Sequence, residues 1–430
     1  MLLSCAVVLL VYALSHLMQA LGAGGAATSV VYAVGALLLL WEMLSAASER
    51  VRTVDDDQRS TLDTLRVVAL VPAYNEDEGA LRQCLGSMLA QTRRIDAIAV
   101  VDDGSTSGDY PAVRAWFAEA AAAAGVETFW SRQPNGGKRT AQIAGVRMAG
   151  DADVYLTVDS DTVLDPRAVE TGLMPFADER VQSVAGIVLT SNYGTNLLTR
   201  MQELWFTTMQ LVNRSALSRM GSVMVNCGGL AFYRAAVVTE NVETYLSETL
   251  FGRPMHASDD SLLTLFSLQR GRAVQQRDAF AFTLMPTRFS HHRRQQLRWL
   301  RGSTVRSAWR FRYLPTDRFA YWYHLAKWAQ YAAVTAVLVL LLASGVLFSW
   351  SVLLWTLVVV GAIQLLVDAP YLTLRRSDQS TAQRLGVYAT APLIGLWQLT
   401  FMRVMRWYAM ATVKKVATVW GTRGTVEVTA

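Results

Sequence analysis

The chain has 430 residues, of which 52% are hydrophobic and 17% charged, and its formal net charge is +6. Soluble domains carry about a quarter charged residues, so this composition indicates a membrane portion and argues against a wholly soluble protein. The three cysteines are far apart and odd in number, which argues against a disulfide framework and a cysteine zinc site. The soluble part is therefore predicted to face a reducing compartment.

Two apolar runs open the chain, at 2–21 and 26–44, with a glycine-rich stretch between them. Each is about long enough to cross a bilayer. A cleaved signal peptide is the alternative for the first run, but this run lacks a basic start and a second run follows at once. We expect residues 1–47 to form a transmembrane hairpin, which leaves the N-terminus and residue 50 on the same side.

The region 48–290 has soluble character and is predicted to form an α/β domain. Short β-branched or apolar runs typical of strands alternate with helical patterns. The strands are predicted at 66–72, 95–101, 127–131 and 154–158. This alternation predicts a parallel sheet, which binds ligands at the carboxyl ends of its strands.

Apolar character returns toward the C-terminus. A basic amphipathic segment at 291–322 precedes a region at 323–411 that contains three apolar runs, 324–350, 351–372 and 385–402. Arginines after the second run mark a cytoplasmic loop by the positive-inside rule. Basic residues also follow the last run, so we expect it to enter and leave on one side or to lie in the interface, with 412–430 as a cytoplasmic tail.

Polar motifs follow the first two predicted strands, V-P-A-Y-N-E at 71–76 and V-D-D-G-S-T at 101–106. A carboxylate at a strand end can accept hydrogen bonds from a base or a ribose, although such residues also populate ordinary turns. The segment N-G-G-K-R at 135–139 can bring backbone amides and the charge of Lys138 to a diphosphate, with a solvated loop as the alternative.

The fourth predicted strand ends in T-V-D-S-D-T at 157–162. Asp159 and Asp161 alternate with Ser160, so both carboxylates can approach one ion. Hard divalent cations take oxygen ligands and keep positions open for phosphate oxygens. This is the strongest isolated signal in the chain, with an ordinary turn as the alternative.

Two further motifs each have a structural alternative. The segment S-D-D at 258–260 precedes an apolar helix and suits either a helix cap or a general base that deprotonates an acceptor hydroxyl. The segment Q-Q-L-R-W at 295–299 lies among seven arginines between Arg293 and Arg312. It suits an amphipathic helix on anionic lipid or a platform on which an indole stacks against sugar rings.

The ordered set of these motifs resembles the processive glycosyltransferases of family 2, which include hyaluronan, chitin-oligosaccharide and cellulose synthases. The resemblance runs from about residue 67 to 424. It implies an α/β nucleotide-sugar-binding domain of GT-A type joined to an α-helical transmembrane region in the plasma membrane, with the catalytic domain cytoplasmic. It further implies Mg²⁺ or Mn²⁺ as cofactor, and a UDP-sugar donor, a growing polysaccharide and membrane lipid as partners.

On the donor side, the resemblance assigns the uridine to Tyr74, Glu76 and Asp103. Lys138 is expected to approach the diphosphate, which Asp159 and Asp161 would bind through the metal.

On the acceptor side, Asp260 matches the family's catalytic base and Asp259 is expected among the substrate-binding residues beside it. Further acceptor-side or gating positions are expected at Cys227, Gly228, Gly229, Gln295, Arg298, Trp299, Trp420, Thr422 and Arg423. The last three belong to the segment W-G-T-R, which resembles a gating segment.

The hyaluronan branch is favoured by V-D-S-D-T, by Q-Q-x-R-W and by a W-G-T-R that nearly ends the chain. The chain departs from the family at Gly229, where proline is expected, at Ser258, where glycine is expected, and at Ser261, where a basic residue is expected. Short chitin oligomers, a single sugar on a lipid, or a nucleotide-binding transporter or scaffold are the alternatives. Nucleic acid is not an expected partner, because the arginines cluster beside a membrane span. The oligomeric state stays open.

Overall fold

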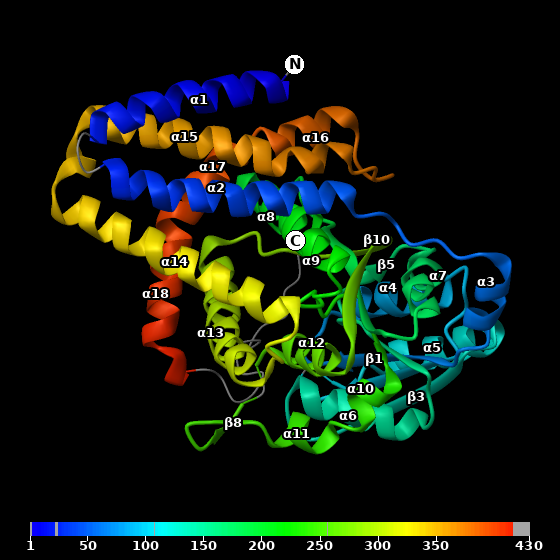
Figure 1. Cartoon of the computed structure of the whole chain (residues 1–430). Coiled ribbons are helices and arrows are strands. Elements are labelled where there is room, and N and C mark those ends of the chain that lie inside the picture. Colours follow the sequence, from blue (N-terminus) through cyan, green and yellow to red (C-terminus); the bar gives the residue numbers. More distant parts are fainter. Residues whose placement is uncertain (1, 22–24, 107, 256, 416–430) are drawn as a thin grey trace.

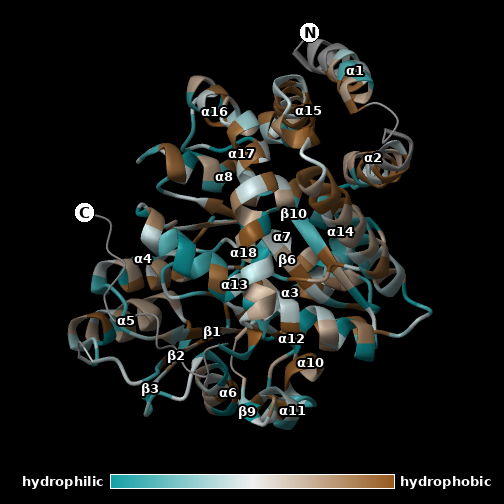
Figure 2. Cartoon of the chain, turned by 90° about the vertical axis from the view of Figure 1, so that its left-hand side faces the viewer, coloured by the Kyte–Doolittle hydropathy of each residue, from teal (hydrophilic) through white to brown (hydrophobic). Residues whose placement is uncertain are grey.

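The computed structural model describes residues 2–21, 25–106, 108–255 and 257–415. An α/β domain lies beside a bundle of long helices that includes both ends of the described chain (Figure 1). Brown hydrophobic residues are prominent along the long helix α15 (Trp350–Asp368), whereas teal hydrophilic residues are spread over the helices and loops of the α/β domain (Figure 2).

One eight-stranded sheet forms the centre of the α/β domain, in the order β3-β2-β1-β4-β7-β6-β10-β5. Its strands are β1 (Val67–Ala73), β2 (Ala97–Asp102), β3 (Glu127–Arg132), β4 (Val154–Thr157), β5 (Val163–Leu164), β6 (Val181–Thr190), β7 (Ala231–Arg234) and β10 (Arg272–Thr283).

The direction of the strands differs in part from the parallel sheet predicted. Strands β3, β2, β1 and β4 run parallel to one another, and β6 runs parallel to β10. However, β7 runs antiparallel to both β4 and β6, and β5 runs antiparallel to β10. The sheet is therefore mixed. Hydrophobic periodicity does not report the direction in which a strand runs, so the sequence did not show that β7 is antiparallel.

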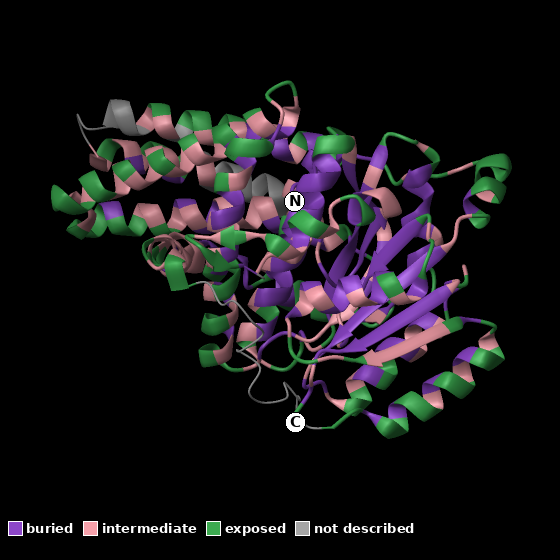
Figure 3. Cartoon of the chain, turned by 90° about the horizontal axis from the view of Figure 1, so that it is seen from below, coloured by how far each residue is buried: buried purple, intermediate pink, exposed green. Residues whose placement is uncertain are grey.

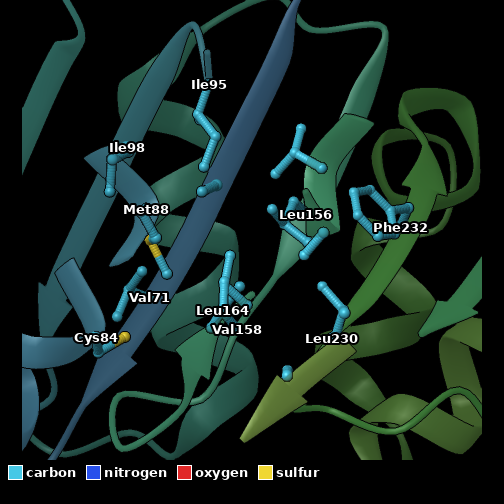
Figure 4. Packing of buried hydrophobic residues seen from close by; sticks show 14 of the residues in the cluster. Val71, Cys84, Met88, Ile95, Ile98, Leu156, Val158, Leu164, Leu230 and Phe232 are labelled. Carbon is cyan, nitrogen blue, oxygen red and sulfur yellow. The ribbon is translucent and has the colours of Figure 1, made fainter. Parts of the chain in front are cut away.

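Helices cover both faces of the sheet, so the strands bury side chains on both sides (Figure 3). Alternate residues of β1 belong to two different hydrophobic clusters. On one face Val71 packs with Cys84 and Met88 of α4 (Figure 4), and on the other Leu70 packs with Ile143 of α6.

The helices of this domain are α3 (Asp56–Asp63), α4 (Glu78–Leu89), α5 (Pro111–Ala124), α6 (Lys138–Ala149), α7 (Ala168–Leu173), α8 (Leu197–Met209), α9 (Ser215–Arg219), α10 (Ala235–Thr239), α11 (Val242–Ser247) and α12 (Asp259–Arg270). A hairpin of β8 (Thr249–Leu250) and β9 (Arg253–Pro254) follows α11.

The long helices are α1 (Leu2–Leu21), α2 (Gly25–Ser48), α13 (Phe289–Tyr313), α14 (Phe319–Ala343) and α15 (Trp350–Asp368). Among the described residues, four segments are long and apolar enough to cross a membrane: Ser29–Ser48, Phe319–Ala343, Trp350–Thr373 and Thr381–Ala411. These segments support a membrane location for the protein.

The last of these segments is not one straight helix. It consists of α16 (Thr381–Tyr388), α17 (Ala391–Trp397), a π-helical turn at Gln398–Met402 and α18 (Arg403–Ala411). Pro392 lies in the first turn of α17, where its missing amide is tolerated. Helix α18 crosses the direction of α2 and α15 and packs on α13 (Figure 1).

A buried ion pair joins the helical bundle to the α/β domain. Arg376, in the loop between α15 and α16, lies 2.5 Å from Glu203 of α8, and neither side chain is exposed. The hydroxyl of Tyr371 also donates to Glu203, at 3.2 Å. Breaking such a pair leaves an uncompensated buried charge, which is strongly destabilising. This pair is therefore a buried polar contact between α8 and the loop that precedes α16.

Candidate active site

The predicted donor-side residues converge at the carboxyl ends of β1, β2 and β4. Beyond the end of β1, Glu76 is buried and its carboxylate accepts a hydrogen bond from Ser160 at 2.7 Å. The backbone amide of Glu76 donates to the hydroxyl of Tyr110 at 2.7 Å. Tyr74 lies half-buried beside them. The loop after β1 is thus bound directly to the loop after β4.

Asp103, after β2, is fully buried and accepts three hydrogen bonds from the loop that follows β3. Its Oδ1 accepts from the Gln133 amide at 2.7 Å and from the Gly136 backbone at 3.0 Å, and its Oδ2 accepts from the Gly137 backbone at 2.7 Å. Gly137 has φ 92°, a conformation that favours glycine. Asp103 therefore shapes the turn that starts α6 with Lys138.

Lys138 lies between two carboxylates from different elements. Its Nζ is 2.6 Å from Oδ1 of Asp159, beyond β4, and 3.1 Å from Oδ2 of Asp259, at the start of α12. Burial by itself would lower the pKa of this lysine, but Asp159 and Asp259 raise it well above its usual value. The Lys138 ammonium therefore stays charged and holds together the carboxylates of Asp159 and Asp259.

Asp260 and Asp259 are adjacent carboxylates in different protonation environments. Burial and the neighbouring charge of Asp259 raise the pKa of Asp260 to about 6. For Asp259, burial also acts to raise the pKa, but the charges of Lys138 and Arg139 outweigh it and lower the pKa. Two carboxyl groups whose pKa values are pushed apart can take different roles, one as a fixed charge and one as a base.

Ser258 is the residue that precedes this pair, and it does not cap the helix with its side chain. It has φ 60° and ψ 47°, the left-handed region, and makes no side-chain hydrogen bond to the helix end. The capping alternative for the motif is therefore not supported by its geometry.

The rate of the sugar transfer that the sequence resemblance implies is expected to fall as the pH drops below about 6. A general base works only when ionised, and the pKa of Asp260 is raised from its usual value, so protonation begins at a higher pH than for an ordinary aspartate. We expect kcat/KM, followed by UDP release, to decrease tenfold per pH unit on the acid limb. A rate that stays constant down to about pH 5 would contradict the assignment of this base.

The carboxylates of Asp159 and Asp161 suit a divalent cation that arrives with a phosphate ligand. Within the described part of the chain, no group of three or more histidine, cysteine or acidic side chains is arranged to hold a metal by itself. Mg²⁺ is commonly bound through one or two carboxylates plus substrate phosphates, which is what this pair of oxygen donors offers. The donor set therefore fits Mg²⁺ or Mn²⁺.

The loop of Cys227, Gly228 and Gly229 lies against the same centre. A Cβ atom on Gly228 would stand 2.8 Å from Nζ of Lys138 and 3.3 Å from Oδ2 of Asp159. Arg214 contacts the Cys227 side chain. Burial raises the pKa of the Cys227 thiol to about 11, so the thiol stays protonated. The predicted acceptor loop is thus a direct neighbour of the Lys138–Asp159 pair.

Replacing Gly228 with alanine is expected to weaken donor binding. The added methyl group would displace Nζ of Lys138 from its position between two carboxylates. We expect the KM for the donor to rise roughly 10-fold, measured from initial rates of UDP release. Gly194→Ala is the matched control, because a Cβ there would meet nothing within 4 Å. Equal KM values for both variants would show that the close contact between Gly228 and Lys138 has no effect on donor binding.

The Gln295–Trp299 motif lies on α13, on the side of the molecule where the bundle meets the α/β domain. Trp299 is 37% exposed and stacks on Phe206 of α8, with ring centroids 6.2 Å apart and an interplanar angle of 25°. Arg298 is exposed and Gln295 is half-buried. One face of the Trp299 indole is supported by Phe206, which suits it to stack against a sugar ring. Trp420, Thr422 and Arg423 lie outside the described residues.

The sequence motifs did not reveal a buried cluster around Glu248. Arg139 of α6 and Arg306 of α13 both pair with this carboxylate. The three residues are far apart in the chain and belong to no local pattern. Arg139 directly follows Lys138 in the sequence, but no local pattern indicated that its partner is Glu248.

Comparison with known proteins agrees with this architecture. Residues 68–241 match the model of glycosyl transferase family 2, and residues 155–363 match that of glycosyl transferase family group 2. A hyaluronan synthase of Streptococcus pyogenes is 30% identical over 376 residues, covering 84% of each chain. An N-acetylglucosaminyltransferase of Azorhizobium caulinodans is 36% identical over 243 residues, 56% of this chain and 60% of that protein.

A solved structure has a similar fold. It is the mannosyltransferase PcManGT from Pyrobaculum calidifontis, in complex with GDP-Man and Mn²⁺. The TM-score is 0.57 at 18% identity, and the match covers 87% of this chain and 97% of the other. The likeness supports the expected GT-A-type fold.

Proposed function

Because the chain belongs to glycosyltransferase family 2 and is a hexosyltransferase, we propose that it polymerises sugars from UDP-sugar donors by an inverting, processive reaction. One observation carries the proposal: Lys138 bridges Asp159 and Asp259, next to Asp260. A diphosphate-binding cation, a metal-binding carboxylate and a base candidate thus meet at one edge of the sheet. Family membership sets aside the alternative of a transporter or scaffold that only binds nucleotide.

In the proposed donor complex, Tyr74, Glu76 and Asp103 hold the uridine. Lys138 approaches the diphosphate, and Asp159 and Asp161 would hold Mg²⁺ or Mn²⁺. When bound, this ion neutralises negative charge on the leaving diphosphate. The hydrogen bond between Glu76 and Ser160 keeps the nucleoside loop and the metal loop in a fixed relation.

The transfer step uses Asp260 as the base. Its carboxylate takes the proton of the acceptor hydroxyl while that oxygen attacks the anomeric carbon from the face opposite the diphosphate. The bond between the anomeric carbon and the phosphate oxygen breaks, and UDP leaves with the electron pair. Configuration inverts, so an α-linked donor gives a β-linkage, as in the in-line logic of inverting glycosidases. Asp259 remains ionised against Lys138.

The proposed acceptor side is formed by the Cys227–Gly229 loop and by Gln295, Arg298 and Trp299. The indole of Trp299 stacks against the chain end, and Trp420, Thr422 and Arg423 gate the site. We further propose that the catalytic domain faces the cytoplasm, that the basic helices lie on anionic lipid, and that the spans carry the polymer outward.

Hyaluronan, made from UDP-GlcNAc and UDP-glucuronate, is the product we propose. The similarity to the streptococcal hyaluronan synthase over 84% of the chain supports this choice. The second candidate is chitin-type synthesis from UDP-GlcNAc alone, which the similarity to the N-acetylglucosaminyltransferase of Azorhizobium caulinodans favours.

Product analysis separates the two. Purified protein in lipid is incubated with Mn²⁺ and UDP-GlcNAc, with and without UDP-glucuronate, and UDP release and polymer mass are measured. High-mass polymer that forms only with both donors and is cleaved by hyaluronidase is the expected result. Product from UDP-GlcNAc alone would replace hyaluronan by a chitin-type product.

A further inference from the structure

Glu248 lies where three elements of the site meet, just after α11. Arg306 of α13 donates to both of its oxygens, at 2.8 and 3.1 Å, and Arg139 of α6 lies 2.7 Å from Oε2. The indole N–H of Trp309 donates to Oε1. Both guanidinium groups are completely buried. Burying three charges is costly, so a cluster of this kind is weak evidence for stability and invites another explanation.

The same two arginines hold the backbone in front of the base. Nη2 of Arg139 donates to the Ala257 carbonyl at 2.7 Å, and Nη2 of Arg306 donates to it at 3.5 Å. The next residue, Ser258, is in the left-handed region, which is unfavourable for a residue with a Cβ atom. Such a conformation persists only when several contacts with the surrounding structure hold it in place.

Helix α13 also holds this turn by direct packing. A Cβ atom on Gly302 would stand 3.1 Å from Cβ of Ser258, so the two elements are in close contact. Arg306 lies one turn farther along the same helix. The turn before Asp259 is therefore fixed from two sides, by α6 through Arg139 and by α13 through Gly302 and Arg306.

We propose that Glu248 is a positioning residue for the transfer reaction. It orients Arg139 and Arg306 so that they fix the turn at 257–258, and this turn aims Asp260 at the acceptor hydroxyl. Arg139 directly follows Lys138, so the cluster also ties the diphosphate-binding end of α6 to the first turn of α12. The inference rests on the proposed role of Asp260 as the base.

The test compares Glu248→Gln with the wild-type enzyme in lipid, using whichever UDP-sugar the wild type turns over. The amide keeps the shape of the side chain but removes its charge. We expect kcat to fall roughly 30- to 100-fold, because small displacements of a reacting group are costly, while the KM for the donor changes less than about 3-fold. Glu248→Asp keeps the charge and is expected to recover most of the lost kcat.

Two controls separate positioning from loss of stability. Glu203→Gln removes a carboxylate from another fully buried ion pair, with Arg376, which has no part in the proposed transfer step. We expect it to lower the melting temperature but to leave kcat per folded enzyme unchanged. Combining Glu248→Gln with Arg306→Gln should cost little more than either change alone, because residues that act as a unit are not additive.

A Glu248→Gln enzyme with wild-type kcat and a lowered melting temperature would overturn the proposal. So would an equal loss of kcat in Glu203→Gln, since the effect would then follow stability alone. The identity of the polymer does not enter this comparison. A failure of the hyaluronan assignment is therefore distinguishable from a failure of the positioning role.

Discussion

The Asp260→Asn variant is expected to lose about 1,000-fold or more in the rate of sugar transfer while still binding UDP. Asparagine has the size of the carboxyl group but cannot take a proton from the acceptor hydroxyl. The Lys138 contacts to Asp159 and Asp259 do not involve Asp260, so the diphosphate side of the site is preserved. The loss should therefore appear in kcat.

The measurement pairs initial rates of UDP release with UDP binding by calorimetry. Stability gives an internal control: burial and Asp259 disfavour the charged form of Asp260, so a neutral residue there should not lower the melting temperature at neutral pH. The pKa of Asp260 is higher in the folded protein than in the unfolded chain. The protein therefore loses stability as the pH rises from the unfolded-state pKa to the folded-state pKa. Continued polymer synthesis by this variant would remove Asp260 from the mechanism.

The Asp161→Asn variant is expected to lose most metal-dependent turnover. One oxygen of its neighbour Asp159 already contacts Lys138. Removing the charge of Asp161 therefore leaves Asp159 as the one remaining carboxylate of the pair that can bind the cation. We expect the Mn²⁺ concentration for half-maximal rate to rise about 100-fold, and EDTA to abolish turnover of the wild type reversibly.

Asp151→Asn serves as the matched control, because Asp151 is exposed just before β4, at the other end of that strand. Its metal requirement should equal that of the wild type. Rates of UDP release are titrated with Mn²⁺ and Mg²⁺ for all three proteins. An Asp161→Asn enzyme with the wild-type titration curve, or full wild-type turnover in EDTA, would rule out the proposed metal site.

The parts of the site that the sequence predicted are those with local signals. Glu76, Asp103 and Asp159 each follow a short apolar strand, and parallel strands bring their carboxyl ends to one edge. The apolar helix after Asp260 was also visible as a pattern, whereas the helix that starts at Lys138 was not predicted. The structure accordingly brings Lys138, Asp159, Asp259 and the Cys227 loop together.

The features that the sequence did not predict depend on contacts between distant residues. The antiparallel direction of β7 is defined by its pairing with β4 and β6, which no local pattern in the sequence encodes. The hydrogen bonds from Gly136 and Gly137 to Asp103 join the loops that follow two different strands, β3 and β2. The Glu248 cluster combines three elements in the same way. The division of 381–411 into three helices follows Pro392 and a π-helical turn, whereas hydropathy alone shows one apolar run.

A structure of the Asp260→Asn enzyme in lipid with UDP-GlcNAc and Mn²⁺, determined by electron cryo-microscopy, tests the proposed transferase centre. We predict that the diphosphate lies beside Lys138, with the metal on Asp159 and Asp161, and that the anomeric carbon faces residue 260. A donor bound away from Lys138, or a sugar turned away from residue 260, would contradict the proposed transferase centre.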